Sequence, residues 1–178
     1  MKPFVGLDVD GVVAGFGTYV CQELGLDPDK LTTWDYASSY SREVAKQVYR
    51  LIDEPATWVG VPVLPGAKSA LSRLRLAGVP FIFITSMPAK FLPLRRWWFH
   101  EHFGFKPHLL VAESADRKPD FARQLGMTHF IEDKPSTAEA IAKAGIESWL
   151  VPTSYMGMPP EGVRVGTLEE FSEAVTLP

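Results

Sequence analysis

The feature that most constrains the fold is an apolar run near the start of the chain, residues 4–13, which contains Asp8 and Asp10 followed by Gly11. This pattern predicts a strand buried in a parallel sheet. Such strands present functional groups at their carboxyl ends. Two acids placed there are solvated in a turn, hold a cation or take part in chemistry. Gly11 would let the backbone turn sharply and approach a ligand closely.

Three later apolar runs also end in polar side chains. Thr85 and Ser86 follow residues 81–84, Lys118 follows residues 108–112 and a short polar loop, and Glu132 and Asp133 follow residues 129–131. Each signal alone has an ordinary explanation: a hydroxyl after a strand, a solvated lysine, or acids that begin a helix before Pro135. Their order along the chain is more informative than any one of them.

The segment Asp8–Val12 resembles the first motif of the haloacid dehalogenase superfamily, and the three later signals stand in the order of that superfamily's other motifs. The resemblance covers about residues 4 to 151. It implies that Asp8 is a nucleophile that forms an aspartyl-phosphate. It also implies that Asp10 protonates the leaving group and then activates water, that Thr85 donates a hydrogen bond to phosphoryl oxygens, and that Lys118 keeps Asp8 ionised.

The same resemblance implies a Mg²⁺ ion held by oxygen ligands, which this cation prefers. The ligands would be Asp8, the backbone carbonyl of Asp10, Glu132 and Asp133. Asp10 also argues against a dehalogenase, because a halide leaving group needs no acid. A phosphatase, which transfers phosphate to water, is therefore favoured.

Alternation of apolar runs with helical periodicity predicts an α/β protein with a Rossmann-like parallel sheet. The expected strands lie near 3–9, 79–85, 107–112, 128–132 and 147–151, and helices are expected over 13–24, 41–53, 67–77, 91–103, 135–144 and 167–175. About 70 residues separate the first two strands, too many for a plain crossover. We expect residues 16–62 to form a small helical cap over the active edge, and residues 1–15 and 63–178 to form the core.

Four segments lie around these motifs: Asp8–Phe16, Pro62–Ala67, Ile84–Ser86 and Ile131–Pro135. Together they resemble the 5'(3')-deoxyribonucleotidases, which implies deoxyribonucleoside monophosphates as substrates. At the place of Phe16 that family has an aromatic residue that helps to hold the nucleobase. Aromatic residues near the place of Trp58 also line its pocket, and Ser86 would support the phosphate. The pair Trp97–Trp98 has a counterpart too, but its helical spacing favours core packing.

Two departures from that family stand out. The family has two aspartates where this chain has Glu132 and Asp133, so the division of metal binding between them stays open. It also has an arginine where this chain has Asp116, two residues before Lys118. Phosphate contacts and substrate preference are therefore expected to differ.

Composition narrows the alternatives. The 178 residues are 46% hydrophobic and 22% charged, with a net charge of -3, which predicts a soluble protein with no basic surface for nucleic acid. The single cysteine, Cys21, cannot form an internal disulfide, and no segment is long and apolar enough to cross a membrane. We therefore expect a cytoplasmic protein in which Cys21 is packed.

The four histidines, at 100, 102, 108 and 129, have no metal-site spacing and are expected to be solvated or packed. Three alternatives to a nucleotidase stay open: a phosphatase of a small sugar or metabolite phosphate, a phosphatase of nucleic-acid 3'-phosphate ends, and a non-catalytic binding module. The expected partner is a small-molecule phosphate ester, and a homodimer remains an option.

Overall fold

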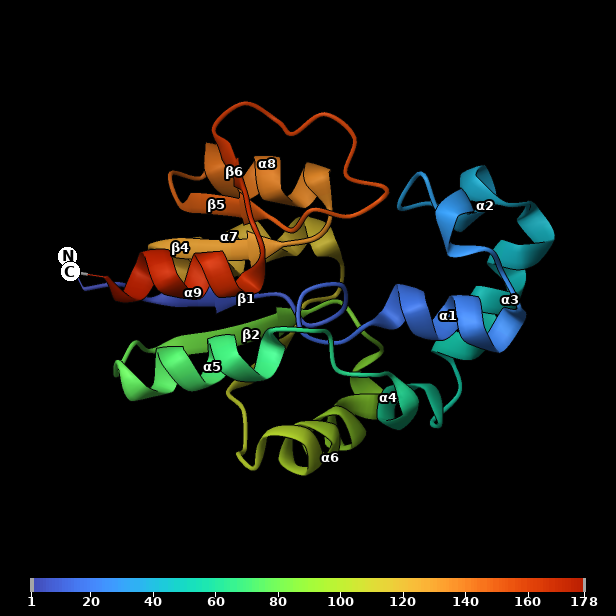
Figure 1. Ribbon diagram of the computed structural model, residues 1–178, viewed down its shortest axis with the longest axis horizontal. Helices are drawn as coiled ribbons and strands as arrows, with labels where there is room; N and C mark the ends of the chain where they lie inside the picture. The colour runs from blue at the N-terminus through green and yellow to red at the C-terminus, as the bar shows by residue number, and fades with distance from the viewer. Residues whose placement is uncertain (1, 178) are drawn as a thin grey trace.

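The protein, described here from a computed structural model over residues 2–177, is built on a single six-stranded sheet. The ends of the predicted core, residues 1 and 178, lie outside the described part. All strand pairs are parallel and the strand order is β3-β2-β1-β4-β5-β6. Figure 1 labels the strands from β2 to β6 in this order. The strands are β1 (Val5–Leu7), β2 (Phe81–Thr85), β3 (Leu109–Val111), β4 (His129–Glu132), β5 (Glu147–Leu150) and β6 (Val163–Val165).

Helices cover both faces of this sheet (Figure 1). The core helices are α5 (Ala67–Leu76), α6 (Leu92–Phe103), α7 (Lys118–Gln124), α8 (Pro135–Lys143) and α9 (Leu168–Thr176). Side chains of α5, α6 and α9 pack in one buried cluster with β1, while α7 and α8 pack in a second cluster with Ile84 and Phe130. The architecture is therefore the predicted α/β Rossmann-like layering, with a three-layer core.

The predicted strands and core helices are confirmed within a few residues. Thr167 caps α9, and its side chain and that of Glu170 form a reciprocal capping box. The sequence analysis did not predict α7 or β6. Both are short, since α7 has 7 residues and β6 has 3, and neither offers a long periodic pattern.

Residues 16–62, which we call the inserted segment, contain most of the remaining helices. They are α1 (Phe16–Leu24), η1 (Pro28–Lys30), α2 (Tyr36–Ser39), α3 (Arg42–Ile52) and α4 (Thr57–Gly60); two further 3₁₀ turns, η2 (Ala89–Phe91) and η3 (Ala115–Arg117), lie in the core. Helices α1, α2 and α3 lie beyond the carboxyl end of β1 (Figure 1). Cys21, in α1, is buried as expected.

The chain enters and leaves the inserted segment at adjacent points. The Gly15 amide donates to the Pro62 carbonyl at 2.8 Å, and the Leu64 amide donates to the Val13 carbonyl at 2.9 Å. Just before this junction Gly11 has φ +88°, and a Cβ there would collide with the side chain of Asp133. A glycine is therefore required where the loop after β1 passes the loop after β4.

Candidate active site

The carboxyl ends of β1 and β4 bring together acids that are far apart in the sequence. Leu7 pairs with Ile131 in the sheet, and the Asp8 amide donates to the Ile131 carbonyl at 3.0 Å. Asp8 therefore lies beside Glu132 and Asp133. All three carboxylates are buried. This is where the strand order reverses, the usual place for a ligand in a sheet of this type.

Lys118 is the buried cation of this cluster. It is the first residue of α7, and its Nζ lies 2.8 Å from Asp8 Oδ1 and 2.9 Å from Glu132 Oε2. Asp8 Oδ1 also accepts from the Val9 amide at 2.7 Å, and Glu132 Oε1 accepts from the Lys134 amide at 3.3 Å. One ammonium thus fixes two carboxylates, and the backbone fixes each of them a second time.

Burial perturbs the protonation of the whole cluster. Burial, and then the charge of Glu132, raise the pKa of Asp8 well above its usual value, with Lys118 acting in the opposite direction. Burial and the charge of Asp8 raise the pKa of Asp133 to about 7. Burial alone would lower the pKa of Lys118, but the carboxylates of Asp8 and Glu132 raise it overall. Three buried acids around one ammonium leave negative charge uncompensated.

The cluster fits a hard divalent cation. One carboxylate oxygen from each of Asp8, Glu132 and Asp133 lies within 4.8 Å of the others. The donor set is all oxygen, which suits Mg²⁺. Asp133 is also oriented from outside the cluster, because Tyr155 Oη donates to its Oδ2 at 2.6 Å. None of the four histidines belongs to this group among the described residues.

Asp10 lies in a different environment from Asp8. Its side chain is 23% exposed. Its Oδ1 accepts from Arg95 Nη2 at 2.6 Å, and its Oδ2 accepts from Thr85 Oγ1 at 3.4 Å. The two aspartates, two residues apart in sequence, therefore bond to different cations: Asp8 to the lysine of α7, and Asp10 to an arginine of α6.

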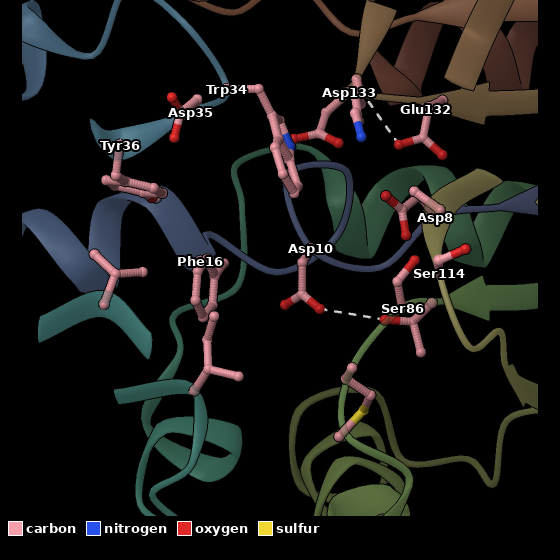
Figure 2. A pocket seen from close by; sticks show the side chains of 18 of the residues that line it. Asp8, Asp10, Phe16, Trp34, Asp35, Tyr36, Ser86, Ser114, Glu132 and Asp133 are labelled. Carbon is pink, nitrogen blue, oxygen red and sulfur yellow. Dashed lines mark hydrogen bonds between the residues drawn. The ribbon is translucent and has the colours of Figure 1, made fainter. Parts of the chain in front are cut away.

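One cavity of about 420 Å³, shown in Figure 2, is lined by the acidic cluster and Lys118 together with Asp10 and Thr85. Figure 2 shows Asp8, Glu132, Ser86 and Ser114 on one side of the cavity and Phe16, Asp35 and Tyr36 on the other, with Asp10, Asp133 and Trp34 between them in this view. Among the described residues, six acidic side chains line the cavity but only two basic ones, Lys118 and Lys134. An anion would therefore meet net negative charge unless a cation were bound.

The aromatic wall has a buried part and an exposed part. Trp58 is only 3% exposed, and its ring stacks with those of Phe16 and Phe91, each at a centroid-to-centroid distance of 6.0 Å. Its Nε1 donates to the Ile52 carbonyl at 3.0 Å. Trp34 is 51% exposed, and the Lys134 ammonium lies 4.4 Å from its ring centroid. The exposed rings of the wall are therefore Trp34 and Tyr49, which is 71% exposed, and the sequence analysis included neither in the site.

Every side chain predicted for the site lines this cavity: Asp8, Asp10, Phe16, Trp58, Thr85, Ser86, Lys118, Glu132 and Asp133. The prediction that both Trp97 and Trp98 pack in the core is half wrong. Trp98 is fully buried, whereas Trp97 is 50% exposed, because neighbours on a helix point about 100° apart and only Trp98 lies on the inward face of α6. Asp116 also lines the cavity, so the departure from the family at this position lies at the site.

Two polar contacts of this site were missed from the sequence. Arg95 carried a signal, since it interrupts the apolar stripe of Phe91 and Trp98 at helical spacing. A charge in such a stripe is buried and needs a partner. Tyr155 carried none, because it lies in the irregular loop between β5 and β6.

No protein-family model matches the sequence. No curated protein matches it significantly either. Solved structures do match along nearly the whole chain. A HAD family hydrolase from Deinococcus radiodurans R1 with bound phosphate and sodium superposes with a TM-score of 0.65 at 21% identity, covering 99% of this chain and 97% of the other.

Two further structures are similar to a comparable degree. A D,D-heptose 1,7-bisphosphate phosphatase from B. bronchiseptica, complexed with magnesium and phosphate, gives a TM-score of 0.60 at 21% identity, with 98% of each chain covered. A dehalogenase gives 0.67 at 14% identity, with 99% and 98% covered. At these identities the likeness concerns the fold. The chain therefore has the α/β fold of the haloacid dehalogenase-type hydrolases.

Proposed function

We propose that the protein is a Mg²⁺-dependent phosphomonoesterase that acts through an aspartyl-phosphate. The observation that carries this proposal is the buried Asp8–Lys118–Glu132 ion-pair cluster opening into a cavity that also holds Asp10 and Thr85. The fold is shared with structures that include phosphatases and a phosphate-bound hydrolase. The combination of fold and cluster favours phosphate-ester chemistry over a non-catalytic binding module.

In this proposal a carboxylate oxygen of Asp8 attacks the phosphorus of the ester. The bond from phosphorus to the alcohol oxygen breaks as the bond to Asp8 forms, and Asp10 gives its proton to the departing oxygen. Water then attacks the phosphorus of the aspartyl-phosphate while Asp10 takes back a proton. This second step releases inorganic phosphate and restores Asp8.

Other side chains hold the reacting groups. Thr85 lies at the end of β2 beside Asp10 and would donate to a phosphoryl oxygen. The Lys118 ammonium, already 2.8 Å from Asp8, favours the ionised form of that carboxylate against the effect of burial, and adds positive charge near the phosphate. Ser86, at the exposed entrance beside Thr85, would bind another phosphoryl oxygen.

Asp8, Glu132, Asp133 and the Asp10 carbonyl would hold the Mg²⁺ ion. When bound, the ion supplies positive charge that neutralises both the acids and the phosphate dianion. The net negative lining of the cavity supports this assignment, because two lysines cannot offset six acids and an incoming anion. A similar structure with magnesium and phosphate supports it as well.

The inserted segment, residues 16–62, would act as a cap on a core formed by residues 1–15 and 63–178. Its entry and exit are hydrogen-bonded to each other, so it can pack over the sheet edge as one unit. Phe16 and Trp58 come from this segment, and with Trp34 and Tyr36 they make one wall of the cavity aromatic. A flat base fits against such a wall. This wall supports a nucleoside monophosphate as the substrate, and the sequence resemblance favours the deoxyribonucleoside monophosphates among them.

A sugar phosphate is the second candidate. The similar heptose bisphosphate phosphatase structures favour it, and Asp116 and Asp35 in the lining would hydrogen-bond sugar hydroxyls. Dehalogenation is disfavoured. Asp10 lines the cavity, where it can protonate a leaving alcohol oxygen, whereas a halide leaving group needs no proton.

A panel of phosphate esters with Mg²⁺ tests this proposal. It should contain deoxyribonucleoside and ribonucleoside monophosphates, sugar mono- and bisphosphates, a 3'-phosphorylated oligonucleotide and p-nitrophenyl phosphate. We expect Mg²⁺-dependent release of phosphate, highest with a deoxyribonucleoside monophosphate, and none after chelation with EDTA. A preference for sugar phosphates would move the substrate to the second candidate, and inactivity with every ester would overturn the proposal.

A further inference from the structure

Arg95 is a buried cation beside the cavity that the chemistry above does not use. Its side chain is fully buried, and its Nη2 donates to Asp10 Oδ1 at 2.6 Å. Its Nε and Nη1 have no hydrogen-bond partner among the described residues. Arg95 is absent from the cavity lining, whereas Asp10 is part of it. The guanidinium therefore holds the carboxylate from the side away from the substrate.

Two indole rings hold the guanidinium in place. Its Cζ lies 5.0 Å from the ring centroid of Trp58 and 5.2 Å from that of Trp98, within the range of cation–π attraction. Each ring is fixed in turn, since Trp98 Nε1 donates to the Val61 carbonyl at 2.8 Å and Trp58 Nε1 to the Ile52 carbonyl at 3.0 Å. The Arg95 guanidinium thus lies between Trp98 of its own helix, α6, and Trp58 near the end of the inserted segment.

Burying a guanidinium costs desolvation free energy, and one ion pair often does not offset that cost. A buried arginine with a single ionic partner therefore points to a role for that ion pair beyond stability. An apolar side chain would fill the space between two tryptophans without desolvating a guanidinium. A guanidinium offers only hydrogen-bond donors, so Asp10 Oδ1 faces a donor and not an acceptor. A proton on Asp10 must therefore sit on Oδ2, the oxygen on the side of Thr85. The short bond to Arg95 decides which oxygen carries the proton that is transferred.

We propose that Arg95 is a positioning residue that fixes the orientation of Asp10, so that Oδ2 delivers the proton to the leaving oxygen and later accepts one from water. The inference rests on the proposed phosphatase function and adds a residue to it. It also connects the inserted segment to the chemistry, because Trp58 is one of the two rings that hold the guanidinium.

The experiment compares Arg95→Met with Arg96→Met, the same change at the next residue of α6, which is exposed. The value of kcat/KM is measured for p-nitrophenyl phosphate, whose leaving group needs no proton, and for the alkyl phosphate that the wild type hydrolyses fastest. Arg95→Met should lower kcat/KM at least about 10-fold more for the alkyl ester than for the aryl ester, since general acids typically contribute 10²–10⁴-fold. Arg96→Met should change neither value. Equal losses on both esters would overturn the inference, because a packing defect does not depend on the leaving group.

A double-mutant cycle with Asp10→Asn gives an independent readout. If Arg95 acts through Asp10, Arg95→Met should cost little further activity on the alkyl ester once Asp10 is asparagine. Additive losses would overturn the inference. If Arg95→Met does not fold, Arg95→Lys replaces it: lysine keeps the charge but loses the planar fork, so the same selective loss on the alkyl ester is expected. A wild type that hydrolyses neither ester would refute the proposed function itself, a result distinct from equal losses in an active enzyme.

Discussion

The two sides of the cavity are built on opposite principles. On the sheet side, Asp8, Lys118 and Glu132 are buried and joined by ion pairs of 2.8 and 2.9 Å. On the side of the inserted segment, Trp34 and Tyr49 are exposed rings that line the same space. Buried charges cannot move without leaving a partner uncompensated, so they hold one geometry. Exposed rings can be exchanged at little cost to the fold, which suits them to selecting the substrate.

The largest effect should come from removing Asp8, the proposed nucleophile on the sheet side. Asp8→Asn should lower kcat on the order of 10³-fold or more, because an amide is a poor nucleophile. The variant should fold, since it removes one of three crowded acids. Activity and melting temperature are measured beside Asp29→Asn, an exposed acid outside the cavity, which should behave as wild type. Near-normal turnover in folded Asp8→Asn would show that the ion-paired side of the cavity does not supply the nucleophile.

The next effect concerns pH and the cation. Asp133 has a pKa of about 7 in the folded protein, against an ordinary value of 3.8. The folded state therefore binds this proton more tightly than the unfolded chain does. Without a metal, the contribution of Asp133 to the free energy of unfolding should fall as the pH rises from about 4 to about 7.

Mg²⁺ requires the ionised carboxylates, so its effect should run in the opposite direction. The rise in melting temperature caused by Mg²⁺ should be small near pH 5 and should grow up to about pH 8. Thermal unfolding with EDTA and with Mg²⁺ at each pH measures this. Glu132→Gln should reduce the Mg²⁺-dependent rise. A rise that is independent of pH would place the cation elsewhere.

On the aromatic side, Phe16→Ala should act on substrate choice. Loss of a stacked ring costs on the order of 1–3 kcal/mol, so KM for a deoxyribonucleoside monophosphate should rise about 10-fold while kcat/KM for p-nitrophenyl phosphate is nearly unchanged. Trp97→Ala, an exposed ring outside the cavity, is the control. Equal losses on both substrates with a lower melting temperature would show that Phe16 serves packing instead. In that case its contact with the Trp58 ring, seen in the structure, would be its main role.

The smallest effect should come from Tyr155→Phe. Its hydroxyl orients Asp133 through a bond of 2.6 Å, and the loss of such an outer contact typically weakens metal binding 10- to 100-fold. We expect the lower end, about 10-fold in the Mg²⁺ dissociation constant, with kcat at saturating Mg²⁺ nearly unchanged. Tyr40→Phe, whose hydroxyl donates to the Asp27 carbonyl, is the control. An unchanged Mg²⁺ affinity would show that Asp133 needs no outside support.

The sequence predicted the sheet side better than the aromatic side. Asp8, Thr85 and Glu132 stand at the ends of apolar runs, and parallel strands bring such ends to one edge, so their meeting followed from the fold. The positions of Arg95 and Tyr155 depend on how α6 and the loop after β5 pack. No local pattern encodes that packing, although the charge inside the apolar stripe of α6 was a signal.

The inserted segment was predicted as helical, with helices near 13–24 and 41–53 where α1 and α3 lie. Its short helices α2 and α4 were missed, because four residues are too few to show a period. The described residues contain no helix long and apolar enough to cross a membrane. Which rings face a ligand could not be read from spacing, since Trp58 turned out buried and Trp34 exposed.

The most direct test of the account is to trap the phosphorylated intermediate on the sheet side. Asp10→Asn is mixed with p-nitrophenyl phosphate and Mg²⁺, quenched rapidly, reduced with borohydride and mapped by mass spectrometry. Because the aryl group leaves without a proton while water needs a base, the intermediate should accumulate in this variant. The account predicts conversion of Asp8, and of no other carboxylate, to homoserine, with no conversion in Asp8→Asn. Phosphate release by the wild type with Asp8 unmodified in every sample would contradict it.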